Sequence, residues 1–593
     1  MRTLAELFLE VAEREQAECL LHKVQGEYRP VSSRELADRI RRVAHVLTRW
    51  GIAPGDRVAL MADNGPHWPT VDFAALSVGA VSVPIYPTLL PEQAAYIAQD
   101  SGAKVVFVHT AEQLEGLLAH RAELPGLEKL VLIEGGSDAA GVTSLEQVLA
   151  EGEGYDAGVL AERSRAVEPG ELASLVYTSG TTGQPKGVML THGNFVSNIL
   201  TGIDLLHFTG ENVALSFLPL SHVFERTIDY CYFHVGATIA YAEGVHTVPQ
   251  NLQEVRPHVF VSVPRVYEKF YNRVQEQLAH ASPVRRKLFE WALSVGREAL
   301  PYRLRGEHPS GLLGLKLALA SGLVFSKIHQ RLGGRFEFAF SGGAPLGKEL
   351  AEFFWSAGIH IYEGYGLTET SPVISVNTPG HVKLGTVGRP IPDVEVEIAA
   401  DGEILVRGPN IMQGYFGLEE ETREVLSPDG WFATGDIGEL DPDGFLKITD
   451  RKKEIIVNAY GKNVAPAPIE NRLKASQYVN QAVVIGDQRK FLSALIVPDF
   501  DTLKPWAREA GLGAATPEEL IREPKVRELI DSEVAAVNEK GAKYEQIKAW
   551  ELLPAELTLE GGELTPTQKV KRRVVHEKYR DVIDGMYRGG QDD

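Results

Sequence analysis

The sequence predicts an α/β protein with a large N-terminal domain of layered, mostly parallel sheets and helices, a β-rich subdomain, and a small α+β C-terminal domain. Short runs rich in Val and Ile alternate with helical patterns over about the first 370 residues, which is typical of strand–helix–strand units. A β-rich stretch follows at 386–449. The chain has 593 residues, whereas single hydrophobic cores stop growing at roughly 250–300 residues, so two or more domains are expected.

The elements are predicted in chain order from these runs. A helix is expected over 32–51, SSRELADRIRRVAHVLTRWG. Residues 280–334 interrupt the alternation, because they are typical of two helices joined by the bend GEHPSG. Buried strands are expected over 57–62, 103–109, 129–134, 172–178, 212–220, 237–243, 258–264 and 336–343.

The β-rich stretch and the segment after it set the expected domain boundary. The sequence VEVEIAADGEILVRG predicts a hairpin around Asp401-Gly402. A different pattern begins at DRKKEIIV, and residues 481–499 predict a second hairpin before a helical remainder. We therefore predict an N-terminal domain at 1–449, with a helical insertion at about 280–334, and a C-terminal domain at 450–593.

Composition excludes several classes of protein. The formal net charge of -20 argues against a binder of duplex nucleic acid, which normally presents a basic face. Cys19 and Cys231 are too few for a disulfide framework and no Cys/His spacing suits zinc, so a reducing cytoplasm is expected. The N-terminal sequence MRTLAELFLEVAEREQ predicts an amphipathic helix and not a secretory signal. The longest apolar run, at 311–325, contains Lys316 and is shorter than the roughly 18–20 residues that span a bilayer.

The most distinctive stretch is 177–188, YTSGTTGQPKGV, which follows the apolar run LASLVY. Small residues and hydroxyls allow such a loop to enclose a phosphate with backbone N–H groups, and a lysine adds charge. The spacing differs from the triphosphate loop G-x-x-x-x-G-K-[ST]. A solvated turn has the same composition, so composition alone leaves both interpretations open. The candidate phosphate ligands are Thr178, Ser179, Gly180, Thr181, Thr182, Gly183 and Lys186.

Further motifs follow this loop in a fixed order. They are LPLSHVFER (218–226), SGGAPL (341–346), YEGYGLTET (362–370), GTVGRPIP (385–392), ATGDIG (433–438), DRKKEIIVNAYGKNVAP (450–466) and LTPTQKVKRR (564–573). Together they resemble the AMP-forming adenylate superfamily, which includes acyl-CoA synthetases, firefly luciferase and peptide-synthetase adenylation domains. The resemblance covers about 30–585, and LPLSHVFER with the helical insertion looks most like long-chain fatty acyl-CoA synthetases.

The resemblance implies two half-reactions with ATP, Mg²⁺ and CoA. A fatty-acid carboxylate attacks the α-phosphorus of ATP, giving acyl-AMP and pyrophosphate, and the CoA thiol then displaces AMP. The sequence shows no Ser-His-Asp order and no Cys-His nucleophile, and none is needed, because a carboxylate with a pKa near ~4–5 arrives ionised. The enzyme must instead align two anions and neutralise the charge at phosphorus. The resemblance also implies a mobile C-terminal domain that turns about Asp450 and carries Gly461 toward CoA.

Catalytic roles follow from the same resemblance. Lys569 would neutralise charge at the α-phosphate, which Thr368 would also contact. Glu369 would hold Mg²⁺, with Thr178 sharing that role, because Mg²⁺ prefers oxygen ligands plus phosphate. The phosphate loop would hold the β- and γ-phosphates of the leaving pyrophosphate. His222 would lie near the acyl carboxylate or the path of CoA, with a hydrogen-bonded core histidine as the alternative.

Nucleotide contacts are implied in the same way. Asp436 would accept hydrogen bonds from the ribose hydroxyls, Arg451 would reinforce that contact, and Tyr365 would stack on adenine. Standing alone, Asp436 is typical of an Asx-turn, Arg451 of a surface ion pair and Tyr365 of a core aromatic residue. The remaining nucleotide-side residues are Gly343, Ala344, Pro345, Glu363, Gly364 and Gly366.

Two departures from the family pattern and several alternatives stay open. Gln568 stands where the family has a glycine before its lysine, and Lys571 is the competing candidate for the lysine's role. Arg226 stands where some members carry an aromatic gate, so no such gate is expected. The substrate is either a long-chain fatty acid or another carboxylic acid, and a non-catalytic nucleotide-binding protein is the third possibility. The insertion at 280–334 favours a long apolar substrate or peripheral contact with a membrane, whereas the sequence does not indicate an oligomeric state.

Overall fold

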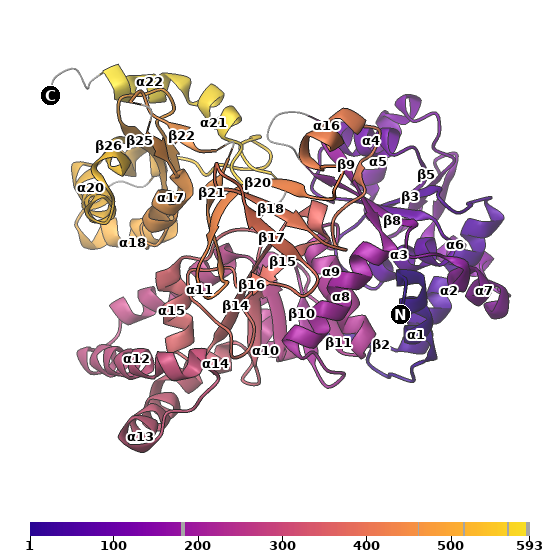
Figure 1. The fold of residues 1–593 in the computed structure, drawn as a ribbon, viewed down its shortest axis with the longest axis horizontal. Helices are drawn as coiled ribbons and strands as arrows, with labels where there is room; N and C mark the ends of the chain where they lie inside the picture. Colours follow the sequence, from indigo (N-terminus) through magenta and orange to yellow (C-terminus); the bar gives the residue numbers. More distant parts are fainter. Residues whose placement is uncertain (179–183, 453, 461, 514–515, 566–568, 589–593) are drawn as a thin grey trace.

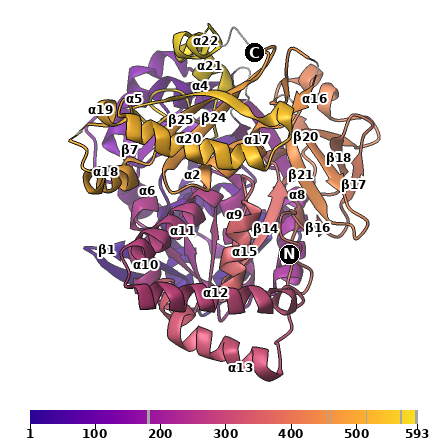
Figure 2. The same ribbon diagram turned by 90° about the vertical axis from the view of Figure 1, so that its left-hand side faces the viewer.

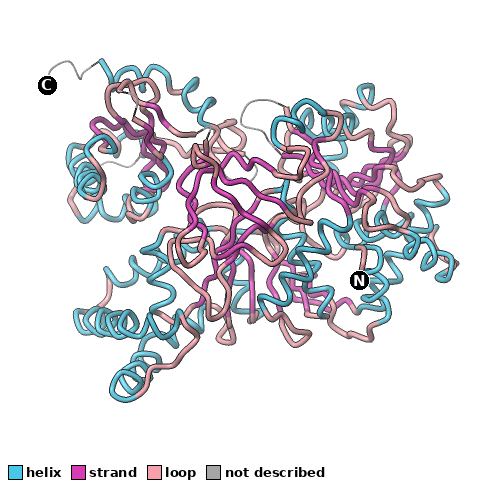
Figure 3. Tube along the Cα trace, viewed as in Figure 1, coloured by secondary structure: helices cyan, strands magenta, loops and turns pink. Residues whose placement is uncertain are grey.

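The computed structural model describes residues 1–593 except 179–183, 453, 461, 514–515, 566–568 and 589–593. The predicted α/β class is confirmed, because helices surround two large sheets in the body of the molecule (Figures 1 and 3). The C-terminal segment forms a smaller lobe at the upper left of Figure 1.

The larger sheet has nine strands in the order β16-β15-β14-β13-β12-β10-β11-β1-β2. Its six central strands are parallel, whereas β2, β15 and β16 pair antiparallel at the two edges. The N-terminal strand joins beside β11, where Leu20 lies opposite Ile239. The strand bounds are β1 Leu20–Val24, β2 Glu27–Val31, β10 Val213–Ser216, β11 Thr238–Tyr241, β12 Val259–Ser262, β13 Phe338–Ser341, β14 His360–Gly366, β15 Val373–Val376 and β16 Arg389–Pro390.

The second sheet has eight strands in the order β19-β9-β8-β4-β3-β5-β6-β7. Strands β8, β4, β3, β5, β6 and β7 are parallel, and β9 and β19 are antiparallel additions. Every residue of β4 is buried, as expected for a strand covered on both faces. The bounds are β3 Arg57–Met61, β4 Val81–Ile85, β5 Ala103–Val108, β6 Lys129–Leu132, β7 Val142–Ser144, β8 Leu172–Thr178, β9 Lys186–Thr191 and β19 Gly414–Tyr415.

Helices connect these strands, and many begin at a capping side chain. Thr110, Ser144 and Thr191 each accept the N–H of the residue three positions later, which satisfies a free donor of the first helical turn. The helices of this part are α1 Leu4–Glu13, α2 Ser33–Arg49, α3 His67–Ser77, α4 Pro91–Asp100, α5 Ala111–Ala119, α6 Leu145–Glu151, α7 Ala157–Ala166, α8 His192–Leu206, α9 Val223–Val235, α10 Val248–Val255, α11 Pro264–Ala279 and α15 Lys348–Ser356, with 3₁₀ turns at Arg121–Glu123 and Val245–Thr247.

The predicted strand at 212–220 is shorter than expected. Strand β10 ends at Ser216, and residues 217–222 form a turn in which the His222 N–H donates to the Pro219 carbonyl at 2.9 Å. Pro219 explains the early end, because proline has no N–H for a sheet ladder. This turn leads into α9, and His222 occupies the position before its first residue.

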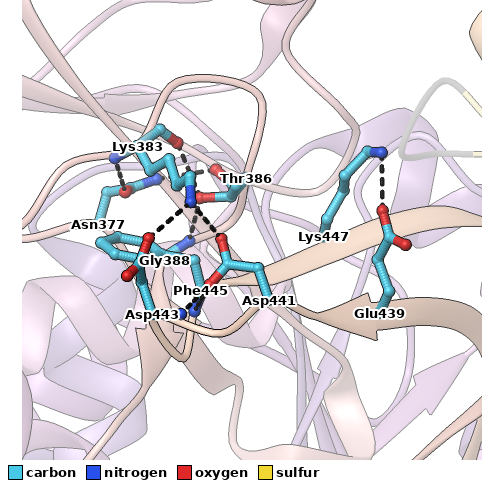
Figure 4. Close-up of polar contacts among 9 residues, drawn as sticks. All are labelled: Asn377, Lys383, Thr386, Gly388, Glu439, Asp441, Asp443, Phe445 and Lys447. Atoms are coloured by element: carbon cyan, nitrogen blue, oxygen red, sulfur yellow. Dashed lines mark hydrogen bonds and ion pairs between the residues drawn. The ribbon is translucent and has the colours of Figure 1, made fainter.

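A four-stranded antiparallel sheet, in the order β17-β18-β20-β21, forms the predicted β-rich subdomain. Its hairpin β20–β21 is fixed to the nine-stranded sheet by the segment 383–388 (Figure 4). Lys383 forms ion pairs with Asp441 at 2.6 Å and Asp443 at 3.0 Å, while Leu446 exchanges backbone hydrogen bonds with the segment. Gly388 has φ +81, and a Cβ there would lie 1.9 Å from the backbone of Val376. The bounds are β17 Glu395–Ile398, β18 Glu403–Arg407, α16 Glu419–Val425, β20 Phe432–Leu440 and β21 Leu446–Arg451.

The C-terminal segment has a three-stranded sheet, β24-β25-β26, and buried apolar clusters of its own. It contacts the rest of the molecule through an ion pair between Lys540 and Glu349 at 2.8 Å and a hydrogen bond from Arg265 to Asn480. The domain boundary near residue 450 stays a prediction. The bounds are β22 Ile456–Val457, β23 Asn463–Val464, α17 Pro466–Lys474, β24 Val479–Ile485, β25 Leu492–Pro498, α18 Phe500–Glu509, α19 Pro517–Leu520, α20 Pro524–Glu539, a 3₁₀ turn at Lys543–Glu545, β26 Ile547–Leu552, α21 Arg572–Lys578 and α22 Arg580–Arg588.

The helical insertion consists of α12 (Pro283–Leu304) and a second helix beyond the predicted bend. That second helix is continuous from α13 (Gly311–Ala320) through a π-helical turn at Ser321–Phe325 into α14 (Ser326–Arg331). The two helices predicted on either side of the bend are therefore confirmed, and the apolar run 311–325 forms the first part of the second helix. Among the described residues, Gly311–Arg331 is the one helix long and apolar enough to cross a membrane, with 22% of its most apolar window buried. One such helix is weak evidence for a span.

Candidate functional site

The predicted phosphate loop connects two antiparallel strands of the eight-stranded sheet, β8 and β9. Thr178 ends β8 and lies opposite Lys186, the first residue of β9. The loop residues Ser179, Gly180, Thr181, Thr182 and Gly183 lie outside the described residues. The structure therefore places the two ends of the loop at the edge of this sheet, and Lys186 belongs to a strand and not to the loop itself.

Tyr415 connects the base of this loop to Glu369. The Lys186 ammonium lies 5.0 Å from the centre of the Tyr415 ring, a cation–π distance. The Tyr415 hydroxyl donates to Glu369 Oε1 at 3.0 Å. Burial and the Glu369 carboxylate raise the pKa of this hydroxyl, so it stays protonated and continues to donate. Sequence reasoning missed Tyr415, because a two-residue strand 46 positions from Glu369 carries no local signal.

Thr368 and Glu369 belong to a 3₁₀ turn, η4 (Thr368–Thr370), that follows β14. The turn is held by its backbone: the Met412 N–H donates to the Glu369 carbonyl at 2.9 Å. Gly366 is required immediately before it, because a Cβ at that position would lie 1.7 Å from the Pro372 carbonyl oxygen. The Glu369 carboxylate is thus presented from a fixed turn beside the phosphate-loop strands.

Tyr365, Asp436 and Arg451 form one hydrogen-bonded group. The Tyr365 hydroxyl donates to Asp436 Oδ2 at 2.7 Å, and the Arg451 guanidinium lies 3.1 Å from Asp436 Oδ1. Asp436 and Arg451 are register partners across β20 and β21, and the Asp436 side chain is buried. The hairpin β20–β21 therefore places the Asp436 carboxylate beside the Arg451 guanidinium. Arg451 pairs with a buried carboxylate and not with a surface one.

The other nucleotide-side residues lie where two adjacent parallel strands end. Gly343, Ala344 and Pro345 follow β13, whereas Glu363 and Gly364 lie on β14. Ser341 of β13 pairs with Glu363 of β14, so both groups meet at one edge of the sheet, as ligand-binding loops do in α/β proteins. Burial raises the pKa of the Glu363 carboxyl to about 8, and its Oε1 has no hydrogen-bond partner among the described residues.

Lys569 approaches this group from the C-terminal segment. The charges of Arg451, Asp436, Glu454 and Glu369, which lie more than a hundred residues earlier in the chain, act on its ammonium. Enclosure by protein and repulsion from Arg451 lower the pKa of the Lys569 ammonium to about 8, although its side chain keeps contact with solvent, which screens both effects. Lys569 exchanges backbone and side-chain hydrogen bonds with Thr565 at 2.8 and 3.0 Å, which orients it on the segment.

His222 lies close enough to Lys569 for the two charges to interact. Burial and the Lys569 charge lower the pKa of His222 to about 4, so the imidazole is neutral at pH 7. Its Nδ1 accepts the Phe224 N–H at 3.1 Å, which leaves the proton on Nε2. His222 is half-buried, and among the described residues no hydrogen bond is found for its Nε2–H.

Asn64 holds the turn that carries His222. Its side-chain amide donates to the Leu218 carbonyl at 2.7 Å and accepts the Leu220 N–H at 3.1 Å. Glu225 adds a third contact, because its Oε1 accepts the Phe217 N–H at 3.1 Å. Asn64 lies in an unremarkable loop after β3, and only the folded structure relates it to residues about 155 positions later.

Asp450 lies at the end of β21, beside Arg451. Its Oδ1 accepts the Arg451 N–H at 2.6 Å, and its side chain is buried. Burial, with repulsion from Glu454 and Glu470, raises the pKa of Asp450 to about 7. Gly461, the other residue expected to move, lies outside the described residues.

Comparison with protein-family models decides the family. Residues 8–416 match the AMP-binding enzyme family, and residues 453–591 match the C-terminal domain of AMP-binding enzymes. The chain is an AMP-binding enzyme. The first match includes the phosphate-loop strands, His222, Tyr365, Glu369 and Tyr415, and the second includes Lys569, whereas Asp436, Asp450 and Arg451 lie between the two matched ranges.

Curated relatives and solved structures agree with this family. The AMP-binding enzyme is 40% identical over 569 residues to the long-chain-fatty-acid–CoA ligase FadD15 of Mycobacterium bovis, covering 95% of this chain and 93% of that protein. It is 34% identical to the peroxisomal long chain acyl-CoA synthetase 7 of Arabidopsis thaliana, covering 95% and 82%. In structure it resembles the adenylation domain of a carboxylate reductase from Mycobacterium chelonae, with a TM-score of 0.78 at 23% identity over 99% of this chain and 91% of that one. It also resembles the anthranilate CoA ligase AuaEII in complex with anthranoyl-AMP, with a TM-score of 0.74 at 21% identity over 98% of both chains. At these identities the structures show a shared fold.

Proposed function

We propose that this AMP-binding enzyme converts a long-chain fatty acid to its CoA thioester in two half-reactions. First, a carboxylate oxygen attacks the α-phosphorus of ATP, forming acyl-AMP as pyrophosphate leaves. Second, the sulfur of CoA attacks the acyl carbonyl, AMP leaves, and the thiol proton is released to solvent. The observation that carries the proposal is the convergence of Lys569 with Glu369, Asp436 and Arg451. The curated relatives named as long-chain acyl-CoA ligases support the choice of acid.

Lys569 has the central role in the first half-reaction. Its ammonium supplies positive charge where two anions meet, and in a partly enclosed site such charge is worth more than in water. Asp436 accepts hydrogen bonds from the ribose hydroxyls, and Arg451 orients its carboxylate through their ion pair. Tyr365 stacks on adenine, and Thr368 contacts the α-phosphate. The strand-end residues Gly343, Ala344, Pro345, Glu363, Gly364 and Gly366 line the nucleotide.

The phosphate loop and one carboxylate serve the departing pyrophosphate. Residues 179–183 hold the β- and γ-phosphates, and Lys186 adds charge to the leaving group. The donor set suits Mg²⁺, because the ion is commonly bound by one or two carboxylates plus substrate phosphates. Among the described residues there is no group of three or more His, Cys, Asp or Glu side chains that would hold a metal without substrate. Glu369 and Thr178 would hold the ion, which neutralises phosphate charge when bound.

The second half-reaction requires a different arrangement of the C-terminal domain. We place the N-terminal domain at 1–449 and the mobile domain at 450–593, with Asp450 at the hinge. Rotation there withdraws Lys569 after pyrophosphate leaves and brings Gly461 toward CoA, as in hinge-bending enzymes generally. The neutral His222 donates its Nε2–H near the acyl carbonyl. Both cysteines are buried free thiols, which suits a cytoplasmic enzyme, and the helical insertion suits peripheral contact with a membrane.

The test is a comparison of acids. Purified enzyme with ATP, Mg²⁺ and CoA is expected to form AMP, pyrophosphate and thioester from palmitate, at rates at least tenfold above those from benzoate or acetate. Chromatography of the labelled thioester and of AMP measures both products in one reaction. Thioester formation only from benzoate or acetate would identify a different acid, and no acid-dependent exchange of pyrophosphate into ATP would identify a non-catalytic protein.

Asn64 offers a test of how His222 is positioned. Asn64→Ala removes two hydrogen bonds to the turn before His222, and we expect kcat for thioester formation to fall about tenfold to a hundredfold, because small displacements of reacting groups are costly. The KM for ATP should change less than kcat, since neither hydrogen bond of Asn64 is made to Tyr365, Asp436 or Arg451. Asn64→Asp is a second variant: it keeps the acceptor for the Leu220 N–H but sets a carboxylate oxygen against the Leu218 carbonyl, so its kcat should fall as well. Equal kcat in wild-type and Asn64→Ala enzyme would show that the clamp is dispensable.

A further inference from the structure

Helix α13 and the π-helical turn after it carry a row of exposed leucines. Leu312, Leu315, Leu319 and Leu323 are 69%, 62%, 52% and 50% exposed. Their spacing of three, four and four residues places them on one face of a continuous helix. Figures 1 and 2 both show α13 at the rim of the molecule, outside α12. We call these four residues the leucine ridge.

The opposite face of the same helix is packed against the protein. Ala320, Val324 and Phe325 are buried, and they belong to the same apolar cluster as residues of α12. The helix is therefore held in place by one face while the leucine ridge stays in water. Single exposed leucines are ordinary, but a contiguous apolar ridge on a projecting element marks an interaction surface.

The charge around the leucine ridge identifies its partner. Residues 280–334 contain nine Lys and Arg and three Glu, a formal charge of +6 in a chain whose total is -20. The helix Gly311–Arg331 contains no acidic residue. Lys316 lies four residues after Leu312 and Lys327 four residues after Leu323, so each lies about one turn beyond a ridge leucine, and Arg331 follows Lys327 by one more turn. An apolar ridge beside cations is complementary to a partner whose interior is apolar and whose outer layer carries negative charge.

We propose that the leucine ridge inserts into the surface of an anionic lipid bilayer, with Lys316, Lys327 and Arg331 against the headgroups. An interfacial helix binds in this way through a buried apolar face and basic flanks. The helix lies in the surface and does not cross it, because its inner face is already occupied by the protein. A second copy of the chain fits less well, since a two-fold contact of ridge with ridge would bring the cationic flanks together. The proposal is independent of which acid the enzyme activates.

The experiment measures co-sedimentation of the full-length protein with vesicles. Wild-type protein is expected to bind vesicles of mixed phosphatidylglycerol and phosphatidylcholine at least tenfold more tightly than vesicles of phosphatidylcholine alone, and added salt should weaken this binding. Leu315→Glu/Leu319→Glu should lower binding to the anionic vesicles at least tenfold. Lys316→Gln/Lys327→Gln/Arg331→Gln should remove most of the preference for phosphatidylglycerol while leaving weak binding to both kinds of vesicle.

A matched control separates the ridge from net charge and from folding. Leu90→Glu/Val159→Glu adds the same two negative charges at apolar side chains that are 47% and 50% exposed elsewhere, and it should bind like wild-type protein. Thermal unfolding and ATP turnover with dispersed fatty acid should be alike in all variants. Wild-type binding by Leu315→Glu/Leu319→Glu would overturn the proposal. So would a wild-type dimer that ignores vesicles and that this variant converts to monomer, which would make the ridge a contact between copies.

Discussion

Lys569→Ala is expected to lower fatty-acid-dependent exchange of pyrophosphate into ATP by about 10²- to 10³-fold, the usual effect of removing one group that stabilises transition-state charge. The variant should still convert supplied acyl-AMP and CoA to thioester at close to the wild-type rate, because the proposed domain rotation would withdraw Lys569 before that step. The charges of Glu369, Asp436 and Arg451 act on Lys569, as expected if Lys569 lies beside the proposed position of the α-phosphate. Lys571→Ala is the matched control: it removes the same charge two residues away and should retain exchange. Equal loss of both half-reactions in Lys569→Ala would contradict the assigned role.

The pH dependence of the exchange reaction provides a second readout of the same residue. Lys569 acts in its charged form, and its pKa is lowered to about 8, so the charged form predominates below pH 8 and is lost above it. Exchange should therefore decline as pH rises through about 8. Lys569→Arg keeps its charge to much higher pH. Its rate should be lower because the guanidinium has a different shape, but the decline near pH 8 should disappear. An unchanged profile in Lys569→Arg would assign the decline to another group.

Much of the site was predictable because its residues lie in motifs with a local signature. Asp436 and Arg451 occur in short stretches whose order identifies the family, and the structure places them in register on one hairpin. Tyr415 and Asn64 were not predictable. Their contacts with Glu369 and with the turn before His222 depend on how separate segments pack, and neither side chain stands in a pattern that differs from an ordinary strand or loop.

The fold shows the same division between local and long-range information. Runs of Val and Ile indicated the buried parallel strands, and their length and composition follow from burial on both faces. The order of strands could not be predicted, because β1 pairs with β11 more than two hundred residues away. The second helix of the insertion was predictable from its composition and from the bend before it, whereas the π-helical turn at Ser321–Phe325 inside that helix was not predicted.

The largest effect on stability is expected at the buried ion pair between Arg226 and Asp72. Arg226 and Asp72 are 1% and 0% exposed and lie 2.5 Å apart. The Arg226 guanidinium also donates to Tyr230 and to Ser174, each at 2.8 Å. Asp72→Ala leaves this cation buried without its partner, which typically costs about 3–5 kcal/mol of unfolding free energy. The first urea-unfolding transition, followed by tryptophan fluorescence, should move to a clearly lower midpoint.

The apolar double variant Asp72→Leu/Arg226→Met distinguishes the cost of an unpaired charge from the value of the pair. Because removing both charges also removes their desolvation penalty, the double variant should recover most of the lost stability. Glu395→Ala breaks an exposed ion pair with Arg407 and should leave the urea midpoint nearly unchanged. A double variant as unstable as Asp72→Ala would show that the hydrogen bonds of Arg226 are needed as such.

Arg226 lies on the helix that begins after His222, and Ser174 lies on the strand that leads to the phosphate loop. Removing the Arg226 side chain therefore also removes a contact that holds this helix to this strand. We expect the double variant to lose acyl-AMP formation although it remains folded.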